Sequence, residues 1–475
     1  MQKRTRSIVA GLVLVFAAGV AAVIAAGMLA SRRDSAVVQR VVGRGSEAVA
    51  RYEEQFTAKK VPAKAQSPAD ERAGAQSVTH SPVGGEEPPA KPLPATELFN
   101  KLGPDAQSVE SQQDYENIEN LVEAKGWSEW TGEDSQFLSE FFGKNAGLLE
   151  EIRRLAGLGE PVYHVDLSKG YATELPHLAQ LRSMARLLRS EAALRASAGN
   201  IQGAMEDYEA IIGLGETLVE EPIIISQLVR IAMMGILFQG MGSALTPGQL
   251  TPEQARAFVQ DTAGMYHREA LVNALVTEAT FGTEAMENFR NGQVFPDVPS
   301  EANAVLGFIY QTPIGGIMLS SDRQNYAEFM ERLAQAAQAP YYEVQAELEA
   351  IDSEVDDLSI LNVLTPILVP ALTRVQGAQA RSEAMLDLTR IGLSLEAYYT
   401  ETGNYPENLN VVARDLGGSV PLDPYTGNSY VYRPAGETFT LYSVGENRQD
   451  DGGRHHFREG DIVWRGVEVE LEQKE

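Results

Sequence analysis

The sequence predicts a mainly α-helical protein with a membrane-spanning segment at its N-terminus and a small α+β module at its C-terminal end. Three observations support this prediction: an uncharged apolar run covers residues 7–30, apolar residues recur at spacings of three and four within 107–379, and short aromatic and β-branched runs follow residue 429. We expect four parts. They are an N-terminal transmembrane helix (1–33), a disordered stalk rich in proline and alanine (34–104), an α-helical domain (105–379), and a C-terminal module of one helix and a small antiparallel sheet (380–475).

The composition is that of an acidic folded protein. The chain has 475 residues, of which 44% are hydrophobic and 22% are charged, so it is long enough for two or three domains. Its formal net charge of -27 argues against a nucleic-acid partner, because the phosphate backbone is bound through clustered lysine and arginine. The chain has no cysteine, so it offers neither a disulfide framework nor a thiolate metal site.

The apolar run at 7–30 is long enough to cross a bilayer, which needs about 20 apolar residues. Its length favours a retained anchor, whereas the alanines near Val23 keep a cleaved signal open as the alternative. The positive-inside rule leaves the orientation open, because basic residues flank both ends of the run: Lys3, Arg4, Arg6, Arg32 and Arg33.

The predicted stalk has too few apolar residues to offset the entropy of ordering it. Within residues 40–54 a short helix is also compatible with the sequence. The rest should be extended and should carry the folded part away from the membrane. Its prolines are Pro62, Pro68, Pro82, Pro88, Pro89, Pro92 and Pro94.

The predicted helical domain contains one apparent helix pair. The first helix has apolar residues from Leu178 to Ala192, Gly199-Asn200 forms the turn, and the second helix carries Ala204 and Tyr208. This spacing resembles a single tetratricopeptide helix pair. No repeat follows at the 34-residue period of that family, so a superhelical array is not expected.

The strongly apolar segment 222–245 could be a second membrane span or a buried core helix. Gln227, Arg230 and Gln239 interrupt it, and a charge at the centre of a bilayer is costly, which favours the core helix. Farther along, Thr251-Pro252 marks a helix start. Residues 291–316 should form a connection, and a helix over 359–372 should be broken by its two prolines.

Few residues in this domain suggest catalysis. Zincin, nucleophile-elbow and phosphate-loop motifs do not occur. Several acidic and histidine residues are isolated, and we interpret them as solvated or structural: Glu206, Glu278, Glu284, Glu287, His164, His177 and His267. Trp127 and Trp130 suggest an anchoring cluster, with a sugar site as the alternative. We therefore expect no enzyme, and an envelope hydrolase with its active site in a cleft of the helical body is the alternative.

The C-terminal module begins with a helix whose apolar face includes Met385, Leu388, Ile391, Leu395 and Tyr398. Gly403-Asn404 and Pro406 should end this helix. Residues 430–432 and 439–442 form a predicted hairpin around 434–437. An acidic, glycine-rich loop (443–453) follows, and Asp461-Ile462 comes after it.

This loop has the ligand types that calcium prefers, since calcium takes six to eight oxygens from flexible loops. The alternative is a solvated turn, because aspartate and glycine dominate turns for conformational reasons. His455-His456 could similarly hold zinc or nickel, but adjacent side chains on extended backbone point apart, which favours a solvated loop.

Several short motifs recur in this region in a specific order: Tyr398-Tyr399, Thr402-Gly403-Asn404-Tyr405-Pro406, Leu422-Asp423-Pro424-Tyr425, Tyr430-Val431-Tyr432, Ser443-Val444-Gly445, Asp450-Asp451-Gly452-Gly453 and Asp461-Ile462. The region therefore resembles the C-terminal part of the major (G-type) pseudopilins of the type II secretion system. The resemblance implies a calcium site, and the matching positions are Asn447, Asp450, Asp451 and Asp461, with backbone carbonyls near Ser443 and Gly445. Asn447 departs from the aspartate that the family usually has.

A second departure lies at the N-terminus, where the pseudopilin leader junction and its nearby glutamate are missing from 7–30. We therefore do not expect the chain to be processed and polymerised as a pilin. The expected function is that of a non-enzymatic scaffold or interaction subunit of the cell envelope, with a calcium-stabilised C-terminal loop. The chain should cross the cytoplasmic membrane once, with its bulk in the periplasm or cell exterior. Its expected partners are the membrane and other envelope or secretion-system proteins.

Overall fold

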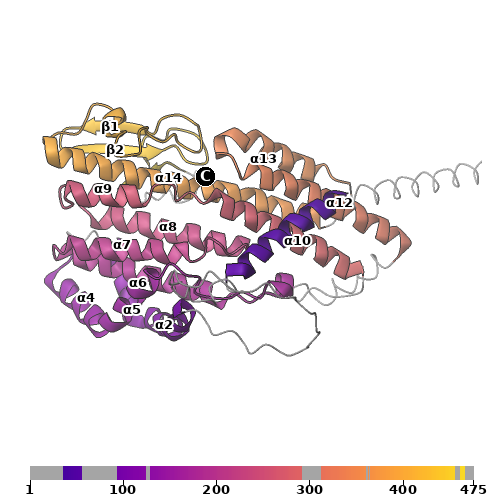
Figure 1. The fold of residues 1–475 in the computed structure, drawn as a ribbon. Coiled ribbons are helices and arrows are strands. Elements are labelled where there is room, and N and C mark those ends of the chain that lie inside the picture. Colours follow the sequence, from indigo (N-terminus) through magenta and orange to yellow (C-terminus); the bar gives the residue numbers. More distant parts are fainter. Residues whose placement is uncertain are drawn as a thin grey trace, which may run out of the picture.

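The structure, a computed structural model, describes residues 36–55, 94–124, 129–290, 312–359, 362, 364–454 and 460–465. This part of the chain is mainly helical and carries a small antiparallel sheet near its C-terminal end, which confirms the predicted fold class at that level (Figure 1). The predicted transmembrane segment, 1–33, lies outside the described residues, and so do Trp127 and His455-His456.

The elements follow one another along the chain with short connections. After a helix over 36–55, the helices are α2 (Pro94–Glu110), α3 (Gln113–Ala124), α4 (Gly132–Lys144), α5 (Ala146–Ala156), η2 (Leu167–Ala172), α6 (Pro176–Ser197), α7 (Ile201–Glu216), α8 (Ile224–Ala244), α9 (Pro252–Asp261), α10 (Arg268–Arg290), α12 (Pro313–Ala336), α13 (Tyr341–Asp356), α14 (Thr365–Thr402) and η3 (Leu409–Val412). The strands are β1 (Val431–Ala435), β2 (Thr438–Ser443) and β3 (Ile462–Val463).

These elements stack in layers. Figure 1 shows α2, α4 and α5 at one side, then α6 and α7, then α8 and α9, then α14 with the sheet over it. A second group, α10, α12 and α13, packs around the first half of α14. Buried residues from α2 through α9 belong to one hydrophobic cluster with those of the second half of α14 and of the sheet. The C-terminal module therefore has no separate core.

The pair α6 and α7 has the predicted turn between its helices. Gly199 has a φ of 77°, in the left-handed region that glycine favours, and the Asn200 side chain accepts a hydrogen bond from the Gly203 amide. Thr251 likewise caps α9 in a reciprocal capping box with Gln254. Local sequence signals thus decide where these helices begin.

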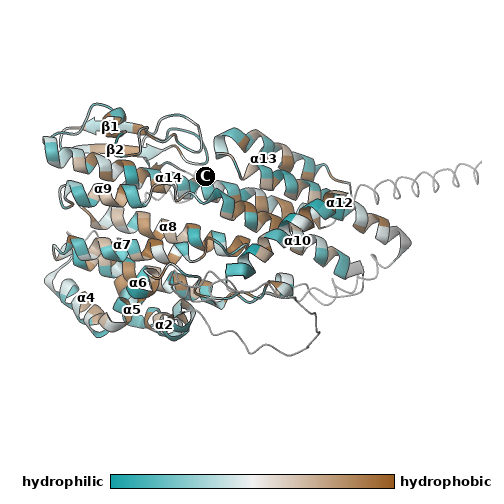
Figure 2. Cartoon of the chain, viewed as in Figure 1, coloured by the Kyte–Doolittle hydropathy of each residue, from teal (hydrophilic) through white to brown (hydrophobic). Residues whose placement is uncertain are grey.

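Helix α8 is the apolar segment that the sequence left open between a membrane span and a core helix. Among the described residues it is the one helix long and apolar enough to cross a membrane, and 61% of its most apolar window is buried inside the protein. Figure 2 shows its brown residues in the middle of the layers. Its Arg230 is buried, and the guanidinium donates to the side-chain oxygens of Gln227 and Gln379 at 2.9 and 3.2 Å. The core-helix prediction is confirmed.

Helix α14 runs through the centre of the molecule and is longer than the sequence suggested. The predicted break near 366–370 does not occur, because Pro366 lies in the first turn, where no intrahelical N–H is needed, and the helix continues through Pro370. The expected domain boundary at 379/380 falls inside α14. The helix ends as predicted, at Gly403, which has a φ of 77° and donates its N–H to Tyr399.

The predicted stalk, 34–104, overlaps two helices that belong to the folded body. In the helix over 36–55, Val38, Val41, Ala48 and Tyr52 are buried at helical spacing, and α2 buries a comparable apolar face. The stalk expectation is therefore corrected at both ends, because tertiary contacts stabilise helices that composition alone does not favour. Residues 56–93 lie outside the described part of the chain.

The sheet has the order β1-β2-β3, and both pairs are antiparallel. Val431 is opposite Tyr442, and Tyr442 is opposite Val463. The predicted hairpin is confirmed, with its turn at Gly436, whose φ is 71°. The predicted acidic loop therefore leaves from the central strand and returns to it through β3.

Candidate functional site

The C-terminal module is attached to α14 by tyrosine hydroxyls from the motifs that the sequence singled out. Tyr425 donates to the Gly377 carbonyl at 3.1 Å, and Tyr430 donates to Asp387 Oδ2 at 2.9 Å. Tyr405 donates to Glu396 Oε1 at 3.1 Å. All three rings are buried, so each bond holds the module in a defined register on the helix.

Asp423, which the sequence did not single out as a site residue, connects two of these loops. Its side chain is buried and accepts N–H bonds from Tyr425 and Val444 at 2.9 and 3.2 Å. Burial raises its pKa, while the hydrogen bonds to its oxygens oppose that rise. This carboxyl ties the 423–427 turn to the start of the acidic loop.

The acidic loop begins where its two ends approach each other. Ser443 Oγ accepts a hydrogen bond from the Gly445 amide at 3.2 Å. Gly445 has a φ of 69°, and a Cβ atom there would lie 2.4 Å from the Gly460 carbonyl oxygen. Only glycine fits this position, which brings Ser443 and Gly445 beside Asp461, as the predicted site requires.

Asp461 is the buried member of the predicted ligand set. Its carboxylate accepts the Gly453 amide at 2.7 Å and the Asp451 amide at 3.4 Å. Burial raises its pKa, the two amide hydrogen bonds oppose the rise, and the negative charges of Asp451 and Asp450 add to it. Asp461 therefore folds the acidic loop back onto β3.

Asn447 and Asp451 form an exposed pair on the same loop. The Asn447 amide group donates to Asp451 Oδ2 at 2.9 Å, and Asn447 Oδ1 accepts the Gln449 amide at 3.0 Å. Asp450, in contrast, is directed toward β1 and β2. It accepts from the Tyr442 hydroxyl at 2.6 Å and pairs with Arg433 at 3.1 Å, contacts that together with the Gly452 amide lower its pKa.

The predicted calcium ligands thus share one loop, but they do not converge on a single point. Among the described residues, no three His, Asp or Glu side chains form a cluster that could hold a metal ion. The oxygen chemistry of Asn447, Asp451, Asp461 and the carbonyls near Ser443 and Gly445 suits calcium. Asp450 is engaged by an arginine instead, so the residues that fit a calcium ion exclude it.

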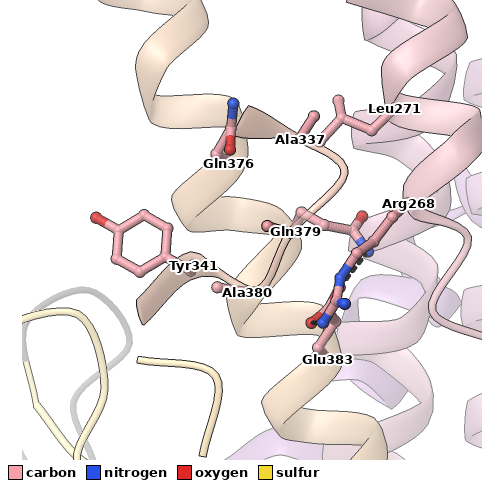
Figure 3. Close-up of a pocket in the computed structure, with 9 residues that line it drawn as sticks. Arg268, Leu271, Ala337, Tyr341, Gln376, Gln379, Ala380 and Glu383 are labelled. Carbon is pink, nitrogen blue, oxygen red and sulfur yellow. Dashed lines mark hydrogen bonds and ion pairs between the residues drawn. The ribbon is translucent and has the colours of Figure 1, made fainter. Parts of the chain in front are cut away.

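A second polar group lies in the middle of α14, where α8, α10 and the α12–α13 connection meet it (Figure 3). Arg268 at the start of α10 makes two bonds to the buried Glu383, at 2.8 and 2.6 Å. Gln379 donates to Glu383 at 3.2 Å, and Gln376 donates to the Leu333 carbonyl at 2.9 Å. The cavity between them measures about 10 Å³, the size of one water molecule, so it is a structural junction.

One turn farther along α14, Asp387 lies at the centre of a buried network. It accepts from the hydroxyls of Tyr266 and Tyr430 at 2.7 and 2.9 Å, and the Arg390 guanidinium lies 3.9 Å away. Burial raises the pKa of Asp387 to about 7, although the tyrosine bonds and Arg390 oppose that rise. This network joins the α9–α10 connection, α14 and the C-terminal module.

The helical body has two clefts in which the predicted carboxylates can be assessed. One, of about 430 Å³, is lined by Glu206 and Glu209 together with Arg153 and Arg154. The other, of about 450 Å³, lies between the helix over 36–55 and α10 and is lined by three arginines with Glu47 and Glu269. Outside these clefts, Glu278 accepts from the Tyr171 hydroxyl and Glu287 pairs with Arg323, while Glu284 is exposed.

The three histidines that the sequence left isolated each have a glutamate partner. The ring Nε2 atoms of His164, His177 and His267 lie 2.8, 3.0 and 2.8 Å from carboxylates of Glu53, Glu221 and Glu216. The interpretation of His177 as a structural residue is supported by its complete burial and by its stacking on Tyr163. No local signal indicates these pairs, because the partners are 44 or more residues apart.

The chain was compared with protein-family models, with curated proteins and with solved structures, and none of them matches it.

Proposed function

We propose that this chain is a membrane-anchored protein of the cell envelope that acts as a non-enzymatic scaffold or interaction subunit, with its C-terminal loop stabilised by calcium. The anchor is the apolar run at 7–30 in the cytoplasmic membrane, and the bulk of the chain lies in the periplasm or cell exterior. The C-terminal region resembles a pseudopilin, so the proposed partners are envelope proteins of a type II secretion or pilus-like system.

The observation that carries this proposal is the rigid attachment of the module to the body through α14. The module shares one hydrophobic cluster with the helices, and buried hydroxyl bonds from Tyr425, Tyr430 and Tyr405 set its position. A protein that presents a module in a fixed orientation suits an interaction role. The carboxylates of the body clefts lie beside arginines, which favours ion pairing over the hydrolase alternative.

Calcium is proposed on the chemistry of the loop. Asn447, Asp451 and Asp461, with carbonyl oxygens near Ser443 and Gly445, would hold the ion. Bound calcium would supply positive charge against the mutual repulsion of the loop carboxylates, which already raises the pKa of Asp461. The loop would then be fixed to β3 by an ion as well as by hydrogen bonds.

Titration of the full chain with calcium tests this site. We expect heat of binding and a rise in melting temperature at millimolar calcium, since extracellular calcium modules bind with Kd of about 0.1–1 mM and binding stabilises the folded state by mass action. Asp451→Asn should remove both signals. Asp450→Asn is the matched control and should keep them, because its carboxylate is directed to Arg433. Neither heat nor a shift in melting temperature in the parent would exclude the calcium site.

The anchor is tested separately by membrane fractionation. The full chain should stay with the membrane after an alkaline wash, and a chain that lacks residues 1–33 should be released. Release of the full chain by the same wash would contradict the proposed localisation.

A further inference from the structure

The helix over 36–55 is fixed to the body along its whole length. Near its start, Arg40 Nη2 lies 3.0 Å from Glu331 Oε2 of α12. Near its end, the Tyr52 hydroxyl accepts the Val165 amide at 3.0 Å and donates to the Tyr163 carbonyl at 3.2 Å. Because both halves are held, this helix belongs to the body.

The middle of the helix crosses α10 at close range. A Cβ atom on Gly45 would lie 1.9 Å from Thr280 Oγ1 and 2.5 Å from the Val276 carbonyl oxygen. The second of these is a backbone atom and has no side-chain rotamer by which to move away. Glycine at this position therefore permits the contact between the two helices.

The contacts also give the direction of the helix. Gln55 donates to Glu220 in the α7–α8 connection at 3.2 Å, so the end of the helix lies there. Its start lies on the opposite side, by α12, where Arg40 also feels the charge of Glu328. Figure 1 shows this indigo helix running from the α12–α13 side toward α6.

Only residues 31–35 separate this start from the apolar run at 7–30. Five residues span at most about 18 Å when fully extended. We propose that the helix over 36–55 holds the body next to the lipid bilayer with its α12–α13 side toward the membrane. This inference rests on the proposed membrane anchor.

The stalk-like sequence does not lie between the anchor and the body in this arrangement. Residues 56–93 follow the helix end near Tyr163, and α2 begins where Thr96 donates to the Pro161 carbonyl at 3.5 Å. Both ends of the stalk-like segment thus join the same stretch, 161–165. The segment closes a loop on the body and does not set its distance from the membrane.

The charge on the membrane-facing side indicates what kind of contact to expect. Glu328 and Glu331 surround Arg40 on α12, and Glu347 and Glu354 of α13 share Arg332. Carboxylates outnumber arginines, so this surface has no electrostatic attraction to anionic lipid. The short link imposes the proximity, and added salt should leave it unchanged.

Energy transfer between single labelled cysteines and acceptor lipids tests the orientation. The full chain has no native cysteine, so Glu328→Cys on α12 and Gly143→Cys on α4 each give one labelled site, and both positions are exposed. In vesicles, we expect several-fold higher transfer from the Glu328→Cys site than from Gly143→Cys, at low and high salt. Equal transfer from both sites would overturn the proposal. Failure of the parent to float with vesicles would instead refute the anchor itself.

A matched pair of substitutions tests the docking. In the Glu328→Cys background, Gly45→Ala should lower the transfer toward that of Gly143→Cys, because the new Cβ displaces the helix from α10. Gly43→Ala should leave the transfer unchanged, since a Cβ there meets nothing within 4 Å. Undiminished transfer in a folded Gly45→Ala variant would refute the docking. If that variant fails to fold, the comparison of the two cysteine sites in the parent still decides the proposal.

Discussion

Gly392 is the position on α14 over which the indole of Trp464 lies. A Cβ atom added at Gly392 would lie 2.5 Å from both Cε2 and Nε1 of that ring, far inside van der Waals contact. Trp464 is buried, and its amide donates to the Leu441 carbonyl at 2.9 Å, so the ring has little room to move. Gly392→Ala should therefore push the end of the sheet away from the helix.

The size of the effect follows from two opposing terms. Overpacking a well-packed core costs about 1–3 kcal/mol, whereas replacing glycine by alanine inside a helix gains about 1 kcal/mol. Gly377→Ala, on the same helix, supplies the second term without the first. Its Cβ would lie 3.1 Å from Glu446 Oε1, the end of a flexible side chain. The two variants should thus differ by about 1–3 kcal/mol, with Gly392→Ala the less stable.

Melting temperatures measured by calorimetry under identical conditions provide the assay. We expect Gly377→Ala to melt at or above the parent temperature and Gly392→Ala to melt below Gly377→Ala. In a Trp464→Ala background, Gly392→Ala should no longer be destabilising, because the atoms that it meets are gone. Equal melting temperatures for the two alanine variants, or an unchanged cost in the Trp464→Ala background, would refute the seating of Trp464 on α14.

Three further predictions concern polar groups. Arg268→Leu should destabilise the protein by about 3 kcal/mol in urea unfolding, because it leaves the buried Glu383 unpaired, and adding Glu383→Leu should restore most of that loss; an additive loss would contradict the pairing. Asp387→Asn should remove a pH dependence: the folded pKa of about 7 lies above the unfolded value of about 3.9, so the parent should lose stability relative to this variant as the pH rises from 4 to 7, and parallel stability curves would refute this. Thr251→Ala should cost about 1 kcal/mol by loss of the α9 cap, whereas Thr251→Ser should be nearly neutral by the same measurement.

The central place of α14 explains why these tests concentrate on it. Its buried face carries Glu383, Asp387 and Arg390 in succession, and each meets a partner from a different part of the chain. Charged groups inside a protein are costly unless they are paired, so each pair admits one arrangement of its neighbours. The helix thus sets the relative position of body and module.

Much of the local structure was predictable from the sequence. Gly403 ends α14, Asn200 and Thr251 cap their helices, and Gly436 makes the hairpin turn, because each of these signals acts within a few residues. Arg230 predicted that α8 belongs in the core, since a charge restricts where an apolar helix can go.

What only the tertiary structure decided involves partners far apart in the chain. The helix over 36–55 looked like part of a stalk until its apolar face met α10, and the histidines looked isolated until Glu53, Glu216 and Glu221 came beside them. The acidic loop was predicted as a unit, but the turn of Asp450 toward Arg433 depended on how β1 and β2 pair. Residue spacing determines which face of an element is apolar or charged; which surface that face meets depends on how the whole chain packs.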